Sequence, residues 1–181
     1  MILGLDVSTS ITGITLLDNE GEVVYNLSVD TRKYKNFFEK AEKVESELLH
    51  LWRSTKLDLL PKRVFIEQSL QSFRSGFSSA KTLSTLSRFN GVVSWMVYKH
   101  WGIEPEYIAA SSARKLAGVK ITKDKKAKQC VIEHVLDNVP AVVIEYTKHG
   151  NPKPHCYDRA DSWVVARAGW ITCQKEKNLE S

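Results

Sequence analysis

The fold is decided by residues 2–13, which read ILGLDVSTSITG. Residues 2–5 form a short apolar run that closes on a carboxylate, Asp6, and this pattern predicts a buried strand that ends at the edge of a sheet. Small polar residues at 8–10 turn the chain, and a second strand is predicted at residues 12–17. A carboxylate at the end of a buried strand costs desolvation free energy unless it is paired or binds a metal. Asp6 is therefore the first candidate for a functional residue.

The rest of the chain alternates strand and helix patterns. Strands are predicted at residues 22–29, 63–67 and 106–110, and long helices at 37–52, 78–101, 123–135 and 157–173. A short helix capped by Ser111 or Ser112 precedes Gly118, and Thr122 is the predicted cap of the helix at 123–135. This order predicts an α/β fold with a five-stranded mixed sheet flanked by helices. Residues 1–173 form one expected domain, and residues 174–181 an expected charged, disordered tail.

Length and composition exclude several classes of protein. The chain has 181 residues, 43% of them hydrophobic, which suits one globular domain. It has no apolar run of about 18 residues, so no membrane span is predicted, and its first residues do not resemble a signal peptide. The spacing of its cysteines, Cys130, Cys156 and Cys173, fits neither a disulfide framework nor a zinc site. We therefore expect an intracellular, reducing, cytoplasmic setting.

Basic residues are concentrated in one segment. The net charge of the chain is only +5. The segment from 114 to 128 holds a single acid, Asp124, and the following basic residues: Arg114, Lys115, Lys120, Lys123, Lys125, Lys126 and Lys128. Such clustering favours binding to a polyanion, of which nucleic acid is the commonest. The alternative is a solvated basic face without a partner.

Four carboxylates lie at positions that favour a chemical role over a role in packing. Glu67 closes the apolar strand at 63–67, as Asp6 closes the first, and Asp158 and Asp161 are three apart on the last predicted helix, so they share a face. If the first and fourth strands are parallel neighbours, the strand-end acids are close and the helix can place the other pair opposite them. Such oxygen ligands suit Mg²⁺, and two ions about 4 Å apart can promote phosphodiester hydrolysis. The alternative for each residue is a strand-end acid, a helix cap or a surface pair.

Three segments resemble the motifs of RuvC-type Holliday-junction resolvases, in the same order and with similar spacing. Residues 2–13 resemble the first motif, an apolar strand, an acid, a small-residue turn and then Thr-Gly. Residues 64–68, VFIEQ, resemble the second, and residues 157–162, YDRADS, resemble the third. The resemblance spans residues 1–172, and although each motif is weak alone, the ordered set is fairly specific.

The resemblance implies a ribonuclease H-like fold and a homodimeric, crossover junction endodeoxyribonuclease. It implies Mg²⁺ or Mn²⁺, two ions per site, at Asp6, Glu67, Asp158 and Asp161, and paired symmetric nicks in four-way DNA that leave 5′-phosphate and 3′-hydroxyl ends. The helix at 78–101, apolar on more than one face, is expected in the dimer contact or in the core of the monomer.

The same resemblance assigns residues that contact DNA. Lys125 and its neighbours match a segment that touches backbone phosphates in the family, which positions DNA without reading its sequence. Phe73 and Phe77, with Arg74 between them, lie where the family can place an aromatic ring at the junction centre, and such a ring stacks on an unpaired base. Packing at the start of a helix is the alternative for these aromatic residues.

Two features depart from the family pattern. Val7-Ser8 stands where the family usually has Pro-Gly, and the loop at 145–155 is longer and more polar than in the family. His149 and His155, in this loop, flank the last acids and are candidates for proton transfer or phosphate contact, with a solvated loop histidine as the alternative. Cys156 has no assigned role.

Three other functions compete with a resolvase. Residues 4–10 also resemble the first phosphate loop of sugar kinases and actin-like ATPases, but a second phosphate loop and an adenosine site are not found. A non-catalytic DNA-binding module would gain nothing from four acids that face phosphate. A related nuclease that cuts flaps, forks or RNA–DNA hybrids would use the same metal site, so the acids do not separate it from a resolvase.

Overall fold

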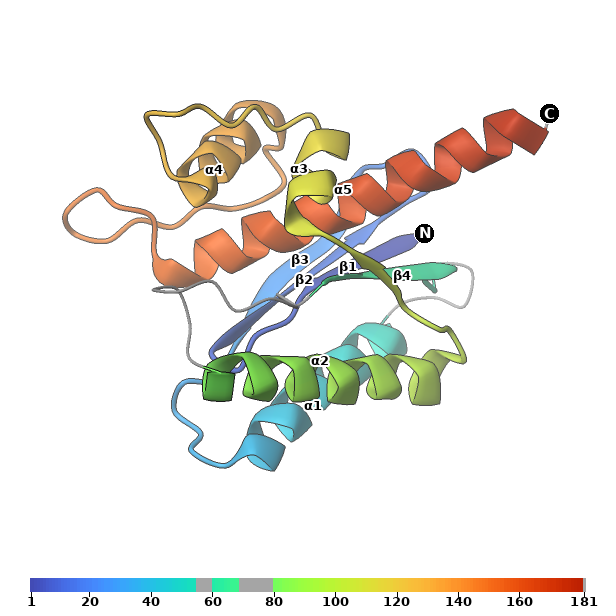
Figure 1. Cartoon of the computed structure of the whole chain (residues 1–181), viewed down its shortest axis with the longest axis vertical. Coiled ribbons are helices and arrows are strands. Elements are labelled where there is room, and N and C mark those ends of the chain that lie inside the picture. Colours follow the sequence, from blue (N-terminus) through green and yellow to red (C-terminus); the bar gives the residue numbers. More distant parts are fainter. Residues whose placement is uncertain (55–59, 69–79, 181) are drawn as a thin grey trace.

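A single mixed sheet organises the computed structural model, which describes residues 1–54, 60–68 and 80–180. The strands are β1 (Ile2–Asp6), β2 (Ile11–Leu17), β3 (Val23–Asp30), β4 (Arg63–Glu67) and β5 (Glu106–Ile108), in the spatial order β3-β2-β1-β4-β5. The first three pair in an antiparallel meander, and β4 runs parallel to both β1 and β5. The predicted five-stranded mixed sheet is confirmed (Figure 1).

Helices cover both faces of this sheet. The helices α1 (Phe37–Ser54) and α2 (Ala80–Trp101) lie on one face, and α5 (Pro154–Glu180) crosses the other. The shorter helices α3 (Ala110–Leu116) and α4 (Ala127–Asn138) pack on the outer side of α5. In the described part of the chain, no helix is long and apolar enough to cross a membrane.

Strand alternation sorts the side chains of the sheet between its two faces. Leu3 and Leu5 of β1 are fully buried in the cluster that contains α1 and α2. The intervening positions, Gly4 and Asp6, therefore point toward α5, because successive side chains of a strand face opposite ways. The same rule directs Glu67 toward α5, since Ile66 is buried in the α1 and α2 cluster. Both strand-end acids thus face the same helix.

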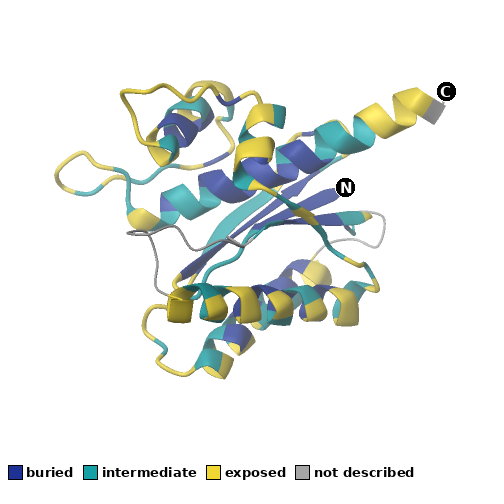
Figure 2. Ribbon diagram, viewed as in Figure 1, coloured by how far each residue is buried: buried dark blue, intermediate teal, exposed yellow. Residues whose placement is uncertain are grey.

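The first half of α5 lies unusually close to the strands beneath it. A Cβ at Gly4 would lie 2.3 Å from the backbone nitrogen of Ala166, and a Cβ at Gly13 would lie 1.9 Å from the carbonyl oxygen of Asp158. Real Cβ atoms do not approach within 3.0 Å, so both positions require glycine. The helix turns in contact with the sheet are correspondingly buried (Figure 2).

Several boundaries differ from the predictions. The strand β5 ends at Ile108, and the helix α3 begins at Ala110 with Ala109 as its N-cap, so neither Ser111 nor Ser112 caps it.

The helix α4 begins at Ala127 with Lys126 as its N-cap, so Thr122 does not cap it and residues 123–126 are not helical. The Thr122 side chain instead hydrogen-bonds to Asp124, which lowers the pKa of that carboxyl. A local polar partner thus competes successfully with the helix terminus.

The segment expected to be a disordered tail is helical as far as Glu180. Arg63, at the start of β4, explains why, because its guanidinium forms an ion pair with Glu176 of α5 and also bonds Glu106 at 2.7 Å. Trp170 adds a bond from Nε1 to the carbonyl oxygen of Asn19, 2.9 Å away. These contacts join the last part of α5 to the sheet, and the turns beyond them are exposed (Figure 2).

Candidate active site

The two strand-end acids occupy adjacent strands. Asp6 is the last residue of β1 and Glu67 the last of β4. The strands are parallel, with Leu5 opposite Ile66, so the next position of each strand carries an acid. The first and fourth strands are thus parallel neighbours, which is the condition under which their terminal acids lie close together.

The helix acids lie above the same edge of the sheet. Asp158 and Asp161 are in the first turns of α5, one helical turn apart on one face. Gly13 connects them to the strands, because it pairs with Asp6 across β1 and β2 and lies directly beneath the backbone of Asp158. Paired residues of antiparallel strands have Cα atoms about 5 Å apart. The glycine therefore allows the helix pair to approach Asp6.

A buried polar network fixes the rotation of α5 between its two acids. The Ser162 hydroxyl donates to the carbonyl oxygen of Arg159 at 2.8 Å and lies 2.8 Å from the hydroxyl of Thr15. The amide of Asn26 donates to Thr15 Oγ1 at 2.7 Å and to the same Arg159 carbonyl at 3.2 Å. Because Thr15 and Ser162 are fully buried, these bonds are costly to break. They hold in register the helix face that carries the acids.

Burial disfavours ionisation of all four carboxyls, and repulsion by neighbouring carboxylates adds to this effect for Asp6, Glu67 and Asp158. Burial, and then the charge of Glu67, hold the pKa of Asp6 well above its usual range. Burial and the charge of Asp161 raise the pKa of Glu67 to about 7. Burial raises the pKa of Asp158 to about 6 and also raises that of Asp161, in both cases against the opposing charge of Lys128. Ionising all four carboxyls together is therefore unfavourable unless a cation offsets their charge.

Two cationic side chains face the acids. The ammonium of Lys128, on α4, lies 3.5 Å from Asp161 Oδ2 although 58% of the side chain is exposed. Burial lowers the pKa of Lys128, but the surrounding carboxylates, Asp161 first, outweigh burial and raise it. Arg114, at the end of α3, lowers the pKa of both Glu67 and Asp161. Positive charge from the basic segment thus reaches the acid cluster itself.

The other basic residues of the segment are exposed beside this site. Lys115 is on the last turn of α3, and the connection from α3 to α4 carries Lys120, Lys123, Lys125 and Lys126. Lys125 pairs with Glu133, with its Nζ 2.8 Å from Oε2. Their role in binding DNA stays a prediction. Phe73, Arg74 and Phe77 lie outside the described residues.

The donor chemistry of the four acids fits a hard divalent cation. All four offer carboxylate oxygens, the ligands that Mg²⁺ and Mn²⁺ prefer, and their raised pKa values show that added positive charge there is favourable. Among the described residues, no three Asp, Glu, His or Cys side chains form a metal-binding group. The fit to a metal thus rests on donor type and charge.

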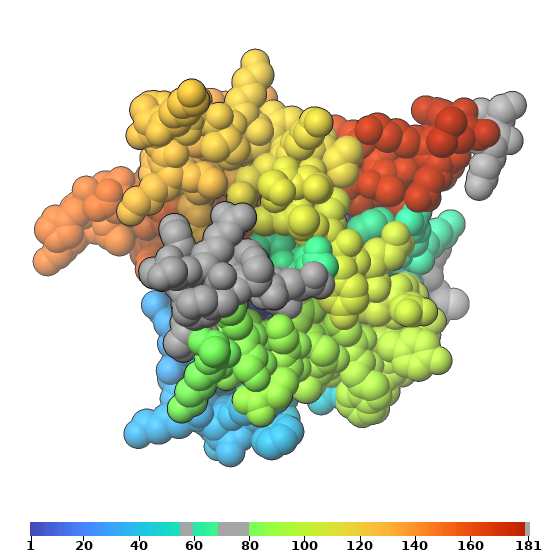
Figure 3. All heavy atoms as spheres, in the orientation of Figure 1, coloured from blue at the N-terminus to red at the C-terminus, as the bar shows by residue number. Residues whose placement is uncertain are grey.

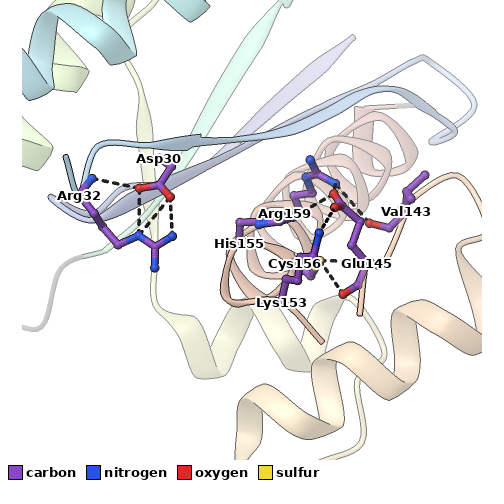
Figure 4. Close-up of polar contacts among 8 residues, drawn as sticks. All are labelled: Asp30, Arg32, Val143, Glu145, Lys153, His155, Cys156 and Arg159. Atoms are coloured by element: carbon purple, nitrogen blue, oxygen red, sulfur yellow. Dashed lines mark hydrogen bonds and ion pairs between the residues drawn. The ribbon is translucent and has the colours of Figure 1, made fainter. Parts of the chain in front are cut away.

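Two residues near the acids were missed from the sequence. Asn90 on α2 is only 4% exposed, and its amide donates to the carbonyl oxygen of Glu67 at 3.1 Å. Its own Oδ1 is buried without a hydrogen-bond partner in the described part of the chain. Arg32 follows β3, pairs with Asp30 (Nε to Oδ1, 3.0 Å) and lowers the pKa of Asp158 (Figure 4). In the sequence, Asn90 is distinguished only as a polar residue next to the apolar Phe89. No sequence feature distinguishes Arg32.

Residues in the first turn of α5 contact the carboxylate and backbone of Glu145, in the loop before the helix. His155 Nε2 lies 3.0 Å from Glu145 Oε1, and Cys156 is fully buried with its sulfur accepting from the backbone N–H of Glu145 at 3.2 Å (Figure 4). His149 is exposed in the loop between them. His155 and Cys156 thus support the loop before α5.

Solved structures with this fold include resolvases. No model of a known protein family matches the sequence, and no curated protein matches it. The RuvC of T. thermophilus in complex with a Holliday junction substrate is 16% identical, with a TM-score of 0.65 over 96% of this chain and 95% of that chain. Another structure of Thermus thermophilus RuvC gives a TM-score of 0.61 at 16% identity, over 97% of this chain and 96% of that one.

A eukaryotic resolvase has a similar structure. The yeast mitochondrial Holliday junction resolvase Ydc2 gives a TM-score of 0.54 at 15% identity, over 98% of this chain and 82% of that chain. These likenesses extend over nearly the whole chain, although the sequences have diverged widely. The protein therefore has the ribonuclease H-like fold of RuvC.

Proposed function

We propose that this protein is a Holliday-junction resolvase, a metal-dependent endonuclease that makes paired symmetric nicks in four-way DNA. One observation carries the proposal: two strand ends and one helix bring four poorly compensated carboxylates to one edge of a RuvC-like sheet. DNA binding alone gives no reason to place buried acids against phosphate. An intracellular, reducing setting belongs to the proposal, because the three cysteines are free.

The four acids and the two nearby cationic residues have different roles in the proposed hydrolysis. Asp6 and Glu67 would hold Mg²⁺ or Mn²⁺ from the sheet, and Asp158 and Asp161 from α5. A cation bound there would supply positive charge that offsets the charge developing on the phosphate. Lys128 and Arg114 add fixed positive charge beside the acids. Water attacks the phosphorus, the bond to the 3′ oxygen breaks, and the products are a 5′-phosphate and a 3′-hydroxyl.

The proposed enzyme is a symmetric homodimer. The exposed face of α2 presents Trp95, 57% exposed, and Tyr98, 60% exposed, beside Tyr107 of β5, 51% exposed. Large aromatic side chains gathered on one surface mark an interaction site. A twofold axis across this face would give two active sites the symmetry that a four-way junction offers.

Cleavage of defined DNA substrates tests this function. We expect Mg²⁺ to support paired symmetric nicks in a labelled four-way junction, and EDTA or Asp161→Asn to abolish them. Asp6→Asn should bind the junction without cutting it. A flap, a fork, an RNA–DNA hybrid and a linear duplex are the matched substrates, and equal cutting of these would replace the proposal with a broader branch-specific nuclease. Binding without any cutting would indicate a non-catalytic module.

A further inference from the structure

A closed hairpin projects from the molecule immediately before α5. Residues 145–153 fold back on themselves through a bridge between Tyr146 and Pro152. The Lys153 N–H donates to the carbonyl oxygen of Glu145, and the Thr147 N–H to that of Asn151, both at 2.8 Å. The hairpin stands out from the body in Figures 1 and 3. It is a built structure held by its own backbone hydrogen bonds.

Glu145 joins the base of the hairpin to the active site. Its carboxylate accepts from Lys153 Nζ at 2.9 Å and His155 Nε2 at 3.0 Å, and Arg159 Nη1 lies 3.4 Å away (Figure 4). Arg159 also donates to the carbonyl oxygen of Val143 at 3.4 Å. Because Arg159 is next to Asp158 in α5, the same helical turn holds both the hairpin and a proposed metal ligand. The position of the hairpin relative to the acids is therefore fixed.

The tip of the hairpin offers positive charge and hydrogen-bond donors to solvent. Lys148, His149 and Asn151 are exposed, and Tyr146 is 48% exposed. No acid occurs between residues 146 and 157. Among the described residues, neither Lys148 nor His149 takes part in a salt bridge. Such a surface fits the phosphate backbone of a nucleic acid better than an apolar or cationic partner.

The length of the hairpin sets how far from its base this contact would fall. Each arm has about four residues, and an extended chain rises about 3.3 Å per residue, so the tip reaches about 13 Å from its base. A DNA strand advances about 3.4 Å per nucleotide along the helix axis, so this reach corresponds to about four nucleotides. The tip can therefore touch a phosphate other than the one that is hydrolysed at the four acids.

We propose that the hairpin of residues 145–153 is a second DNA-contacting element, in which Lys148 binds a backbone phosphate other than the one that is cut. This inference rests on the proposed function, since it takes branched DNA as the ligand. The hairpin holds one DNA arm against the site, and the Glu145 contacts keep the tip and Asp158 at a constant separation.

Junction binding by Lys148→Gln tests the proposal. Binding is measured in EDTA, so that no cutting occurs, at salt concentrations from about 50 to 200 mM. Loss of one phosphate contact should make the slope of log K against log salt shallower by about 0.9. Lys175→Gln, at an exposed position near the opposite end of α5, is the matched control and should behave as wild type. Protection of the DNA backbone at a position outside the cut phosphate should weaken only in Lys148→Gln.

The outcomes separate the two proposals. If the wild-type protein does not bind branched DNA, the proposed function fails. If the wild-type protein binds and cuts junctions while Lys148→Gln keeps the same salt slope and footprint, the hairpin proposal alone is overturned. A changed monomer–dimer equilibrium with an unchanged salt slope also overturns it, because the hairpin would then contact a second copy of the chain.

Discussion

Gly13→Ala should damage the active site from a position that carries no functional group. The new Cβ would lie 1.9 Å from the carbonyl oxygen of Asp158 and 2.9 Å from Ser162 Cβ. The first partner is the backbone of α5 and cannot rotate away. The start of the helix must therefore retreat by about 1 Å before the contact reaches the 3.0 Å that real Cβ atoms respect.

This displacement should cost both stability and activity. Overpacking of a core by one methyl group destabilises by about 1–3 kcal/mol, and each kcal/mol lowers the Tm of a chain this long by about 2–4 °C. A misplacement of about 1 Å at a catalytic site can cost about 100-fold in rate. We therefore expect a folded variant, by circular dichroism, whose affinity for Mn²⁺ by calorimetry and rate of junction cutting both fall at least about tenfold.

Gly169→Ala is the matched control because it disturbs the same helix at a distance from Asp158 and Asp161. Its Cβ would lie 2.2 Å from the Phe65 ring, so it should also lower the Tm. Its position on α5 is about 16 Å from that of Asp158 along the helix. If Gly169→Ala keeps the wild-type metal affinity while Gly13→Ala loses it, the close approach of α5 to the sheet determines the geometry of the metal site. Wild-type metal affinity and cutting in folded Gly13→Ala would refute the reasoning.

Three other perturbations follow from the site and the exposed face of α2. Acids with raised pKa values stabilise the fold below their ordinary pKa, and this contribution is lost as pH rises through the folded values of about 7 for Glu67 and about 6 for Asp158. The Tm of metal-free protein should therefore fall from pH 5 to 8, and Mg²⁺ should raise the Tm more at pH 8 than at pH 5. A rise in Tm on adding Mg²⁺ that does not depend on pH would contradict this. Asn90→Ala removes the donor to the Glu67 carbonyl and should cost about 1–3 kcal/mol in urea unfolding, whereas an unchanged midpoint would show that the bond is dispensable. Trp95→Ala should shift the protein toward monomer in light scattering without lowering the stability of the monomer, and a persistent dimer would exclude that face.

Much of the sheet was predictable because its signals are local. The strand at 63–67 was predicted with its observed bounds, since an apolar run that closes on an acid is contained within five residues. The sequence left open whether the first and fourth strands are neighbours, and their parallel pairing, which brings Asp6 close to Glu67, is seen only in the structure. Alternation along the strands is sufficient to place both acids on one face.

The features that the sequence did not predict all depend on interaction partners. Some of these partners are distant in the sequence, and others compete locally for the same polar group. The helical end of α5 depends on Arg63, which lies on another strand and gives no sign in the residues of the tail. Thr122 was a plausible cap, but its hydroxyl bonds Asp124 instead. Asn90 bonds a carbonyl oxygen at the end of β4, which only the packing of α2 on the sheet reveals. Secondary structure can be inferred from neighbours in the chain, but such contacts depend on the complete fold.

The site also explains why the contacts beneath α5 are so tight. Ionised acids in a poorly solvated cluster repel one another, so the metal-free fold must be held together by other interactions. Close packing of α5 on the glycines at two strand positions supplies part of this stabilisation. The buried hydrogen-bond network that joins Thr15 to Ser162 supplies another part. They also keep α5 from moving outward to separate the charges. The rigidity that stabilises the fold thus maintains the negative charge that a cation and its phosphate ligand would need.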